Sequence, residues 1–169
     1  AEGIDDVVVA TCDEEIVAAV TAAGGKAVMT ADTHERSTER VAEAMESLQG
    51  EVVVVAQGDE PLLLPSDLEL VASPFREQEG VESVTLLSPL EGKADFDNPN
   101  IVKAVCDQRG RIMLYSRAPI PYFQKKGTCP IYRETGIRAF SVGFFSVYIG
   151  LPETPFEQVE AVDMMRLRE

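Results

Sequence analysis

Two carboxylates and an amide follow the run that most strongly predicts a strand. The run is Glu51–Ala56 (EVVVVA), and QGDEP (57–61) comes directly after it. Short β-branched runs are typical of buried strands. Ligands of open α/β sheets bind beyond the carboxyl ends of the strands, so these polar groups would face a binding crevice. Asp59 could hold Mg²⁺, which commonly binds one or two carboxylates plus substrate phosphates. The alternative is a polar turn that leads into a helix.

Patterns for several other chemistries are absent from the sequence. It contains neither a GxGxxG fingerprint nor a GxxxxGK[ST] loop, so a classical dehydrogenase or a P-loop kinase is not indicated. His34 is the only histidine and lies in the polar segment ADTHER (31–36), where we expect it to be exposed to solvent. A Ser-His-Asp or Cys-His mechanism would need this residue, and the sequence identifies no partner for it.

The 169 residues are strongly acidic. Fifteen Lys and Arg stand against 29 Asp and Glu, which gives a formal net charge of −14. Nucleic acids and anionic membranes require surfaces rich in Lys and Arg, so we expect neither as a partner. Three cysteines without a CxxC motif favour free thiols in a cytoplasmic protein. No apolar run approaches the roughly 20 residues of a membrane-spanning helix, and the first residues show no signal-peptide pattern.

The elements that would position the polar groups alternate between strand and helix in the first half. Asp13 can cap the first helix, and Ser66 with Glu69 forms a capping-box pattern for the third. This alternation predicts a mostly parallel sheet with helices on both faces. The expected strands are 6–11, 26–30, 51–56 and 84–87, and the expected helices are 14–23, 37–48 and 66–80.

The pattern changes in the second half. Ile101–Cys106 and Ile112–Ser116 flank a DQRG turn, which predicts an antiparallel hairpin. Ala139–Tyr148 alternates like a further strand, with its Tyr and Phe side chains in the core. Thr154 and Glu157 form a second capping-box pattern around Pro155, which predicts a helix over Pro155–Arg168. The predicted fold class is therefore α/β, mostly parallel, with added antiparallel strands.

Several segments in this order and spacing resemble the 3-deoxy-manno-octulosonate cytidylyltransferases. The specific part is the combination of QGDEP (57–61), FDNPNIVKAV (96–105) and YSRAPIPY (115–122), since any one of these alone would be weak. The likeness extends over nearly the whole chain. It also includes VVVAT (7–11), AAGGKAVMT (22–30), STER (37–40) and, more loosely, PFEQVEAVDMMRLR (155–168).

The resemblance implies a glycosyltransferase-A-like three-layer fold and a cytidylyltransferase activity. Such enzymes transfer CMP from CTP to 3-deoxy-manno-octulosonate (Kdo), an acidic eight-carbon sugar, and release pyrophosphate. The activated sugar is used for lipopolysaccharide synthesis. The resemblance further implies Mg²⁺ as the cofactor, a homodimer and a cytoplasmic location. Nucleotidyl transfer depends mainly on positioning and charge neutralisation. Because the chain and both substrates are negatively charged, Mg²⁺ and a few arginines would have to offset the repulsion locally.

The resemblance also assigns roles to individual residues. It implies that Asp59 binds the metal and that Gln57 lies at the sugar. Arg117 lies near the sugar carboxylate, which a guanidinium can bind through two oxygens, although a surface ion pair is the alternative. It further implies that the loop His34–Arg40 approaches the cytosine, with Ser37, Thr38 and Arg40 as the nucleotide-binding residues. Asp59, Gln57 and Arg117 are thus the expected catalytic residues.

The sequence departs from the family pattern chiefly on the sugar side. Glu134 stands where the family has a histidine, and Arg138 where it has a tyrosine. Asp163 lies where the family helix reads L-E-Q-L-R. We expect Glu134, Arg138 and Asp163 to contact the acceptor, and the alternative for Glu134 and Arg138 is that they pair with each other on a helix or across a turn.

Two family segments have no counterpart in these 169 residues. They are a basic A-R-x-x-S-T-R-x-P-G-K segment and a V-D-T-P-x-D segment that carries a second metal aspartate. We therefore interpret residues 1–169 as a single nucleotidyltransferase domain without the terminal parts of the family fold, and expect little activity from this segment alone. The alternative functions are a cytidylyltransferase for another acidic acceptor, such as amino-Kdo or a phosphonate, and a non-catalytic nucleotide-binding paralogue.

Overall fold

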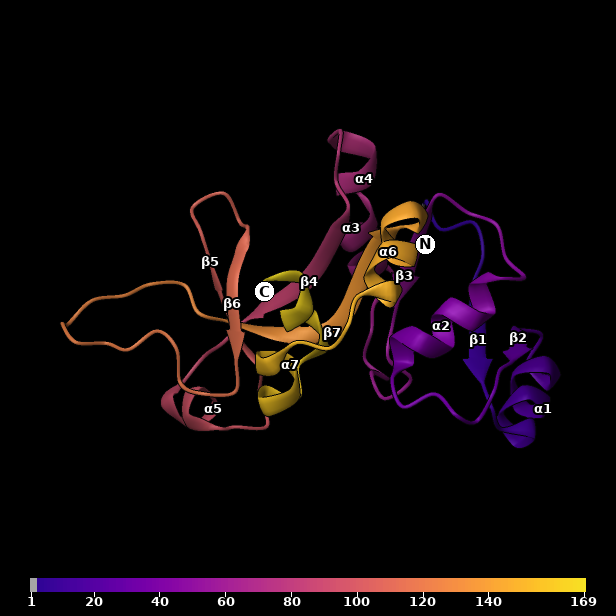
Figure 1. The fold of residues 1–169 in the computed structure, drawn as a ribbon, viewed down its shortest axis with the longest axis horizontal. Helices are drawn as coiled ribbons and strands as arrows, with labels where there is room; N and C mark the ends of the chain where they lie inside the picture. Colours follow the sequence, from indigo (N-terminus) through magenta and orange to yellow (C-terminus); the bar gives the residue numbers. More distant parts are fainter. Residues whose placement is uncertain (1–2) are drawn as a thin grey trace. The chain divides into compact units, whose positions relative to one another are not determined.

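The computed structural model describes residues 3–169, which form two compact units (Figure 1). Unit 1 consists of the chain up to Val84 together with Ile137–Gly150, and unit 2 consists of Thr85–Gly136 together with Leu151–Glu169. Strands β4 (Ser83–Pro89) and β7 (Tyr132–Ser141) contribute residues to both units.

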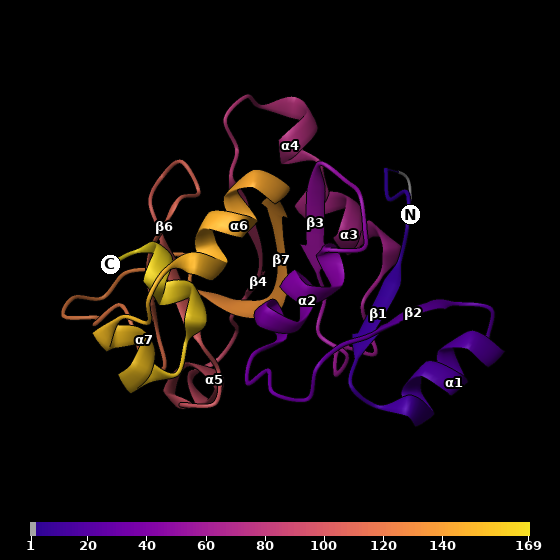
Figure 2. The ribbon, with the colours of Figure 1, turned by 45° about the vertical axis from the view of Figure 1, so that its right-hand side comes forward.

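The elements of unit 1 follow the predicted alternation of strands and helices. Asp13 caps α1 as predicted, because its carboxylate accepts the backbone N–H groups of Glu15 at 2.8 Å and Ile16 at 3.4 Å. α1 packs against β1 and β2, and α2 packs against β1 and α6 (Figure 2). The elements are β1 (Val8–Thr11), α1 (Glu14–Ala22), β2 (Lys26–Met29), α2 (Ser37–Met45), β3 (Val52–Val55), α3 (Pro65–Ala72), α4 (Pro74–Glu77) and α6 (Val142–Gly150).

The strands pair differently from the prediction. β1 and β2 are parallel, with Val8 opposite Lys26 and Thr11 opposite Met29. β3, however, is antiparallel to the end of β7, with Val52 opposite Ser141. The mixed α/β class is confirmed, whereas predominantly parallel pairing is not observed among these pairs. The reason is that β3 takes its partner from a segment far along the chain, which local alternation of strands and helices does not specify.

The predicted strand over Ala139–Tyr148 is wrong beyond Ser141, where helix α6 begins. Phe145 and Tyr148, three residues apart, are both buried, as expected for one face of a helix. Their ring centroids lie 5.2 and 5.4 Å from that of Phe140 in β7. The predicted core location of these aromatic residues is therefore confirmed, while a short apolar run could not distinguish strand from helix.

Helix α3 also begins and ends differently from the prediction. Pro65 is its first residue, and the Asp67 carboxylate accepts the backbone N–H of Leu64 at 2.9 Å. The predicted capping box of Ser66 and Glu69 is therefore wrong, because the observed pair, Leu64 and Asp67, lies two positions earlier. The helix stops at Ala72, and the short helix α4 starts at Pro74, a residue that cannot continue the hydrogen-bond pattern of a preceding helix.

Unit 2 is built around the predicted hairpin. β5 and β6 are antiparallel, with Lys103 opposite Ser116, and β5 also pairs with the start of β7, where Ala104 lies opposite Tyr132. Asp107 holds the turn, because its carboxylate accepts the backbone N–H groups of Arg109 and Arg111, both at 2.9 Å. The further elements are α5 (Lys93–Asp97), β5 (Lys103–Cys106), β6 (Ile112–Ser116), α7 (Pro155–Glu160) and a 3₁₀ helix (Asp163–Leu167).

The predicted helix over Pro155–Arg168 is interrupted. α7 ends at Glu160, and Ala161 adopts a left-handed conformation with φ 52°. The chain then turns back as the 3₁₀ helix, so that Arg166 binds Glu157 through two contacts of 2.8 and 2.5 Å. The Glu157 side chain is 0% exposed and that of Arg166 only 9%. This buried ion pair joins the first turn of α7 to the 3₁₀ helix and requires the chain to reverse direction between them.

We predict that Arg166→Met lowers the free energy of unfolding by about 3–5 kcal/mol, because Glu157 would stay buried without its cation. Lys93→Met is the matched control, since it breaks the exposed Lys93–Asp97 pair and should cost no more than about 0.5 kcal/mol. Urea denaturation followed by circular dichroism measures both. Equal, small losses would contradict the prediction.

Candidate functional site

The predicted polar turn follows β3 in unit 1. Gln57 is half-buried, and its side-chain amide donates to the hydroxyl of Ser37 at 2.9 Å. Ser37 is the first residue of α2, so this bond joins two residues that the resemblance assigns to the sugar side and the nucleotide side, respectively. Asp59 and Glu60 are exposed, and the Glu60 N–H donates to the Gln57 carbonyl at 3.3 Å.

The ligating side chains available at this turn limit how a metal ion could bind. The Asp59 carboxylate accepts no hydrogen bond from residues 3–169 and is exposed. Within those residues, no cluster of three or more His, Cys, Asp or Glu side chains could enclose a metal ion. A single open carboxylate fits Mg²⁺, which retains water and takes further ligands from substrate phosphates. It does not fit a structural zinc site, which needs four protein ligands.

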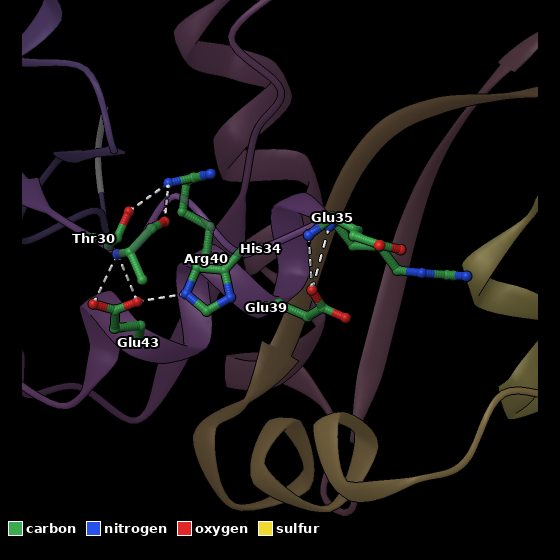
Figure 3. Close-up of polar contacts among 8 residues, drawn as sticks. Thr30, His34, Glu35, Glu39, Arg40 and Glu43 are labelled. Carbon is green, nitrogen blue, oxygen red and sulfur yellow. Dashed lines mark hydrogen bonds and ion pairs between the residues drawn. The ribbon is translucent and has the colours of Figure 1, made fainter.

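Charged side chains of α2 hold the preceding loop (Figure 3). The Arg40 guanidinium donates to the Thr30 hydroxyl at 2.6 Å and to the Ala31 carbonyl at 3.0 Å. Glu39 accepts the backbone N–H groups of Glu35 at 3.2 Å and Arg36 at 3.4 Å, which caps the helix. The loop between β2 and α2 is therefore tied to its own helix by several side-chain contacts.

The expectation that His34 is exposed is wrong. Its side chain is only 21% exposed, and its Nε2 forms a hydrogen bond with the Glu43 carboxylate. Both oxygens of Glu43 also accept the Ala31 N–H, at 3.0 and 3.1 Å, as Figure 3 shows. The hydrogen bond from His34 and then that from Ala31 lower the pKa of Glu43 below its usual range. Sequence reasoning missed Glu43, although its spacing from Arg40 places both on one face of α2.

The remaining nucleotide-side residue, Thr38, is buried within unit 1. Its position therefore favours a structural contribution to the start of α2. Ser37 and Arg40 are half-buried and lie on the same first turns of the helix. The structure thus brings Ser37, Thr38, Arg40 and Gln57 together around the N-terminal end of α2.

Arg117 lies in unit 2, directly after β6, and its guanidinium binds main-chain carbonyls. Nε donates to Glu160 O at 2.6 Å, Nη1 to Pro99 O at 3.1 Å and Nη2 to Ala161 O at 3.3 Å. Sequence reasoning missed Lys103, which is 0% exposed and donates to the carbonyls of Asn98, Ile101 and Arg117. Burial lowers the pKa of Lys103, and the neighbouring Arg117 charge lowers it further.

The other predicted acceptor residues are distributed over two elements. Glu134 and Arg138 belong to β7, so the helix or turn on which their mutual pairing would depend is not found. Arg138 is only 6% exposed, whereas Glu134 is half-buried. Asp163 is half-buried at the start of the 3₁₀ helix. An apolar cavity of about 600 Å³ in unit 2, rimmed by Phe96, Tyr122 and Phe123, contains none of the predicted site residues.

Comparison with known proteins identifies the family to which the chain belongs. A family model described as cytidylyltransferase matches residues 1–169. A 3-deoxy-manno-octulosonate cytidylyltransferase of Acaryochloris marina is 43% identical over 165 residues, which cover 97% of this chain and 67% of that protein. The chain belongs to the 3-deoxy-manno-octulosonate cytidylyltransferase family. The Vibrio parahaemolyticus member is 38% identical, with 98% of this chain and 69% of that protein covered.

A solved structure supports the same family membership. It is described as CMP:2-keto-3-deoxy-manno-octonic acid synthetase complexed with CTP, and it matches with a TM-score of 0.93 at 34% identity. The match covers 99% of this chain and 69% of that one. The predicted resemblance to the 3-deoxy-manno-octulosonate cytidylyltransferase family is therefore confirmed. Separately, no helix within residues 3–169 has the length and apolar character to cross a membrane.

We predict that Glu43→Gln destabilises the protein at neutral pH and that the difference from wild type shrinks in acid. The folded-state pKa of Glu43 is depressed, so its contribution is present above the unfolded-state value, near 4.5, and disappears as pH falls through the folded-state value. Urea denaturation at pH 7 and at successively lower pH measures this. Glu46→Gln, at the exposed position directly after the same helix, is the control and should change the stability little. A pH-independent loss for Glu43→Gln would contradict the prediction.

Proposed function

We propose that this protein transfers CMP from CTP to Kdo or a close analogue and releases pyrophosphate, as a step towards lipopolysaccharide. The observation that carries the proposal is the likeness, over 99% of the chain at a TM-score of 0.93, to a synthetase complexed with CTP. The proposal includes a glycosyltransferase-A-like fold for a single nucleotidyltransferase domain over residues 1–169, a homodimer and a cytoplasmic location.

On the nucleotide side, the N-terminal end of α2 and its preceding loop would contact the cytosine. Ser37 and Arg40 supply polar groups there, and Thr38 supports the helix start from the core. The bonds from Arg40 to Thr30 and Ala31 support this role, because they order the loop before any ligand arrives. An ordered loop reduces the conformational entropy lost on binding.

On the phosphate side, Asp59 would hold Mg²⁺ and Gln57 would lie beside the reacting groups. The exposed carboxylate of Asp59 supports the metal role, and the bond from Gln57 to Ser37 supports a fixed orientation for the amide. The metal would neutralise phosphate charge and polarise the reacting phosphorus–oxygen bond. Such local compensation is needed because the chain carries a formal charge of −14 while both substrates are anions.

On the acceptor side, Arg117 would bind the sugar carboxylate. A guanidinium has five N–H groups, and the three carbonyl contacts leave two for an anion. Glu134, Arg138 and Asp163 would contact other parts of the acceptor. The charged pair Glu134 and Arg138 favours a second candidate acceptor, an amino-substituted Kdo. In that case Glu134 would bind an ammonium or hydroxyl group and Arg138 an anionic group.

We predict that Asp59→Asn lowers turnover at least about 100-fold, because the neutral amide binds Mg²⁺ far more weakly and charge stabilisation is lost. Pyrophosphate release by the complete gene product, with CTP, Kdo and Mg²⁺, measures this. Glu79→Gln, at another exposed carboxylate of unit 1, should retain normal turnover. Near-normal CMP–sugar formation by Asp59→Asn would contradict the metal role. An inactive wild type would instead favour the non-catalytic alternative.

We predict that the double variant Glu134→His with Arg138→Tyr shifts relative kcat/KM towards Kdo and away from amino-Kdo. The expected shift is roughly 1–3 kcal/mol if one or two hydrogen bonds decide the preference. Competition between the two sugars, with wild type and double variant side by side, measures the ratio. Arg133→Gln, at an exposed position on the same strand, is the control. If wild type prefers Kdo and the double variant keeps the same ratio, the two residues do not select the acceptor.

A further inference from the structure

The main chain of Arg117 is held on both sides by charged side chains. Glu160 accepts its backbone N–H at 2.7 Å through one carboxylate oxygen, and the other oxygen accepts the Ser116 hydroxyl at 2.6 Å. Lys103 binds the carbonyl oxygen of Arg117 at 2.6 Å. We infer that Glu160 is a positioning residue that fixes Arg117 for an anionic group of the acceptor. This inference rests on the proposed function.

Glu160 and Arg117 bind each other twice, with backbone and side-chain groups exchanged. The Glu160 carboxylate accepts the main-chain N–H of Arg117, and the Glu160 main-chain carbonyl accepts Nε of the Arg117 side chain at 2.6 Å. These two bonds fix both the start and the end of the arginine side chain. A long flexible side chain loses rotamer entropy when it is ordered. Here that cost is met during folding, before the acceptor binds.

The location of the guanidinium follows from the end of α7. Glu160 is the last residue of this helix, and Ala161 follows it with φ 52°. The carbonyls at a helix C-terminus lack partners within the helix and attract cations. The carbonyls of Glu160 and Ala161 both accept from Arg117, so the guanidinium lies at this helix end.

The charged side chains around Arg117 carry a net positive charge, which one further anion would balance. Lys103 and Arg117 are two cations, and Lys103 has all three protons on carbonyls and cannot bind a ligand directly. Glu160 contributes one anion, and Asp97, which lies near Lys103, is already bound to Lys93. The carboxylate of an acidic sugar at the remaining N–H groups of Arg117 would complete the compensation.

The role of Glu160 can be separated from general stability by kinetics. In the complete gene product, we expect Glu160→Ala to raise KM for Kdo about 10- to 100-fold at saturating CTP, while KM for CTP stays within about 3-fold. Glu160→Gln keeps one acceptor oxygen, so it should show a smaller change with the same split. Gln158→Ala, an exposed neighbour on α7, should leave both constants unchanged.

A double-mutant cycle tests whether Glu160 acts through Arg117. Arg117→Ala should raise KM for Kdo, and adding Glu160→Ala to it should raise KM little further, because the positioned group is already gone. Full additivity, or equal changes in both KM values, would overturn the positioning role. If Glu160→Ala does not fold, an unchanged KM for Kdo in Glu160→Gln overturns it equally. If Arg117→Ala itself leaves KM for Kdo unchanged, the acceptor role of Arg117 fails and the inference fails with it.

Discussion

A buried ammonium group with all three protons on main-chain carbonyls organises unit 2. Lys103 is fully buried in β5, where an unpaired cation would be strongly unfavourable. The carbonyls of Asn98 and Ile101 must therefore converge on it from the preceding loop, and that of Arg117 from the end of β6. Once the peptide of Arg117 is held there, its side chain reaches the end of α7, and Glu160 closes the network from the opposite side.

The same kind of contact orders the loop before α2 in unit 1. Arg40 and Glu43 project from one face of the helix and bind the Thr30 hydroxyl and the main chain of Ala31, and Glu43 also binds His34. In both units, charged side chains bind main-chain groups of neighbouring segments. Main-chain groups have few alternative positions once a strand or helix is formed, so these bonds orient the loops firmly. Residues proposed to meet the substrates are thereby held on ordered segments.

This arrangement is consistent with a strongly acidic enzyme acting on acidic substrates. The chain has a formal charge of −14, so its average field repels both CTP and a sugar acid. The two cations proposed to meet the substrates are each placed by specific bonds, Arg40 through Thr30 and Arg117 through Glu160. A local excess of positive charge at fixed positions can overcome a distant negative surface, because exposed charges beyond about 10 Å are largely screened at physiological salt.

The sequence by itself predicts the features that depend on residues close together in the chain. The cap at Asp13, the alternation of strands and helices in the first half and the β5–β6 hairpin all follow from local patterns and are confirmed. The family could also be recognised, because motifs such as QGDEP (57–61) occur in a specific order. The locations of Gln57 and Asp59 directly after a strand followed from the same reasoning.

Only the tertiary structure decided features that depend on distant partners. β3 pairs with β7 and not with a neighbouring parallel strand, because hydrogen bonding across a sheet carries no local signal. The run after Ser141 is a helix because burial of Phe145 and Tyr148 against Phe140 selects that periodicity. α7 breaks at Ala161, and the chain beyond it returns to the Arg166–Glu157 pair. His34 is half-buried and Lys103 is buried for the same reason. The Glu43 carboxylate and the three carbonyls that bind these side chains come from other segments, and the sequence around His34 or Lys103 does not identify them.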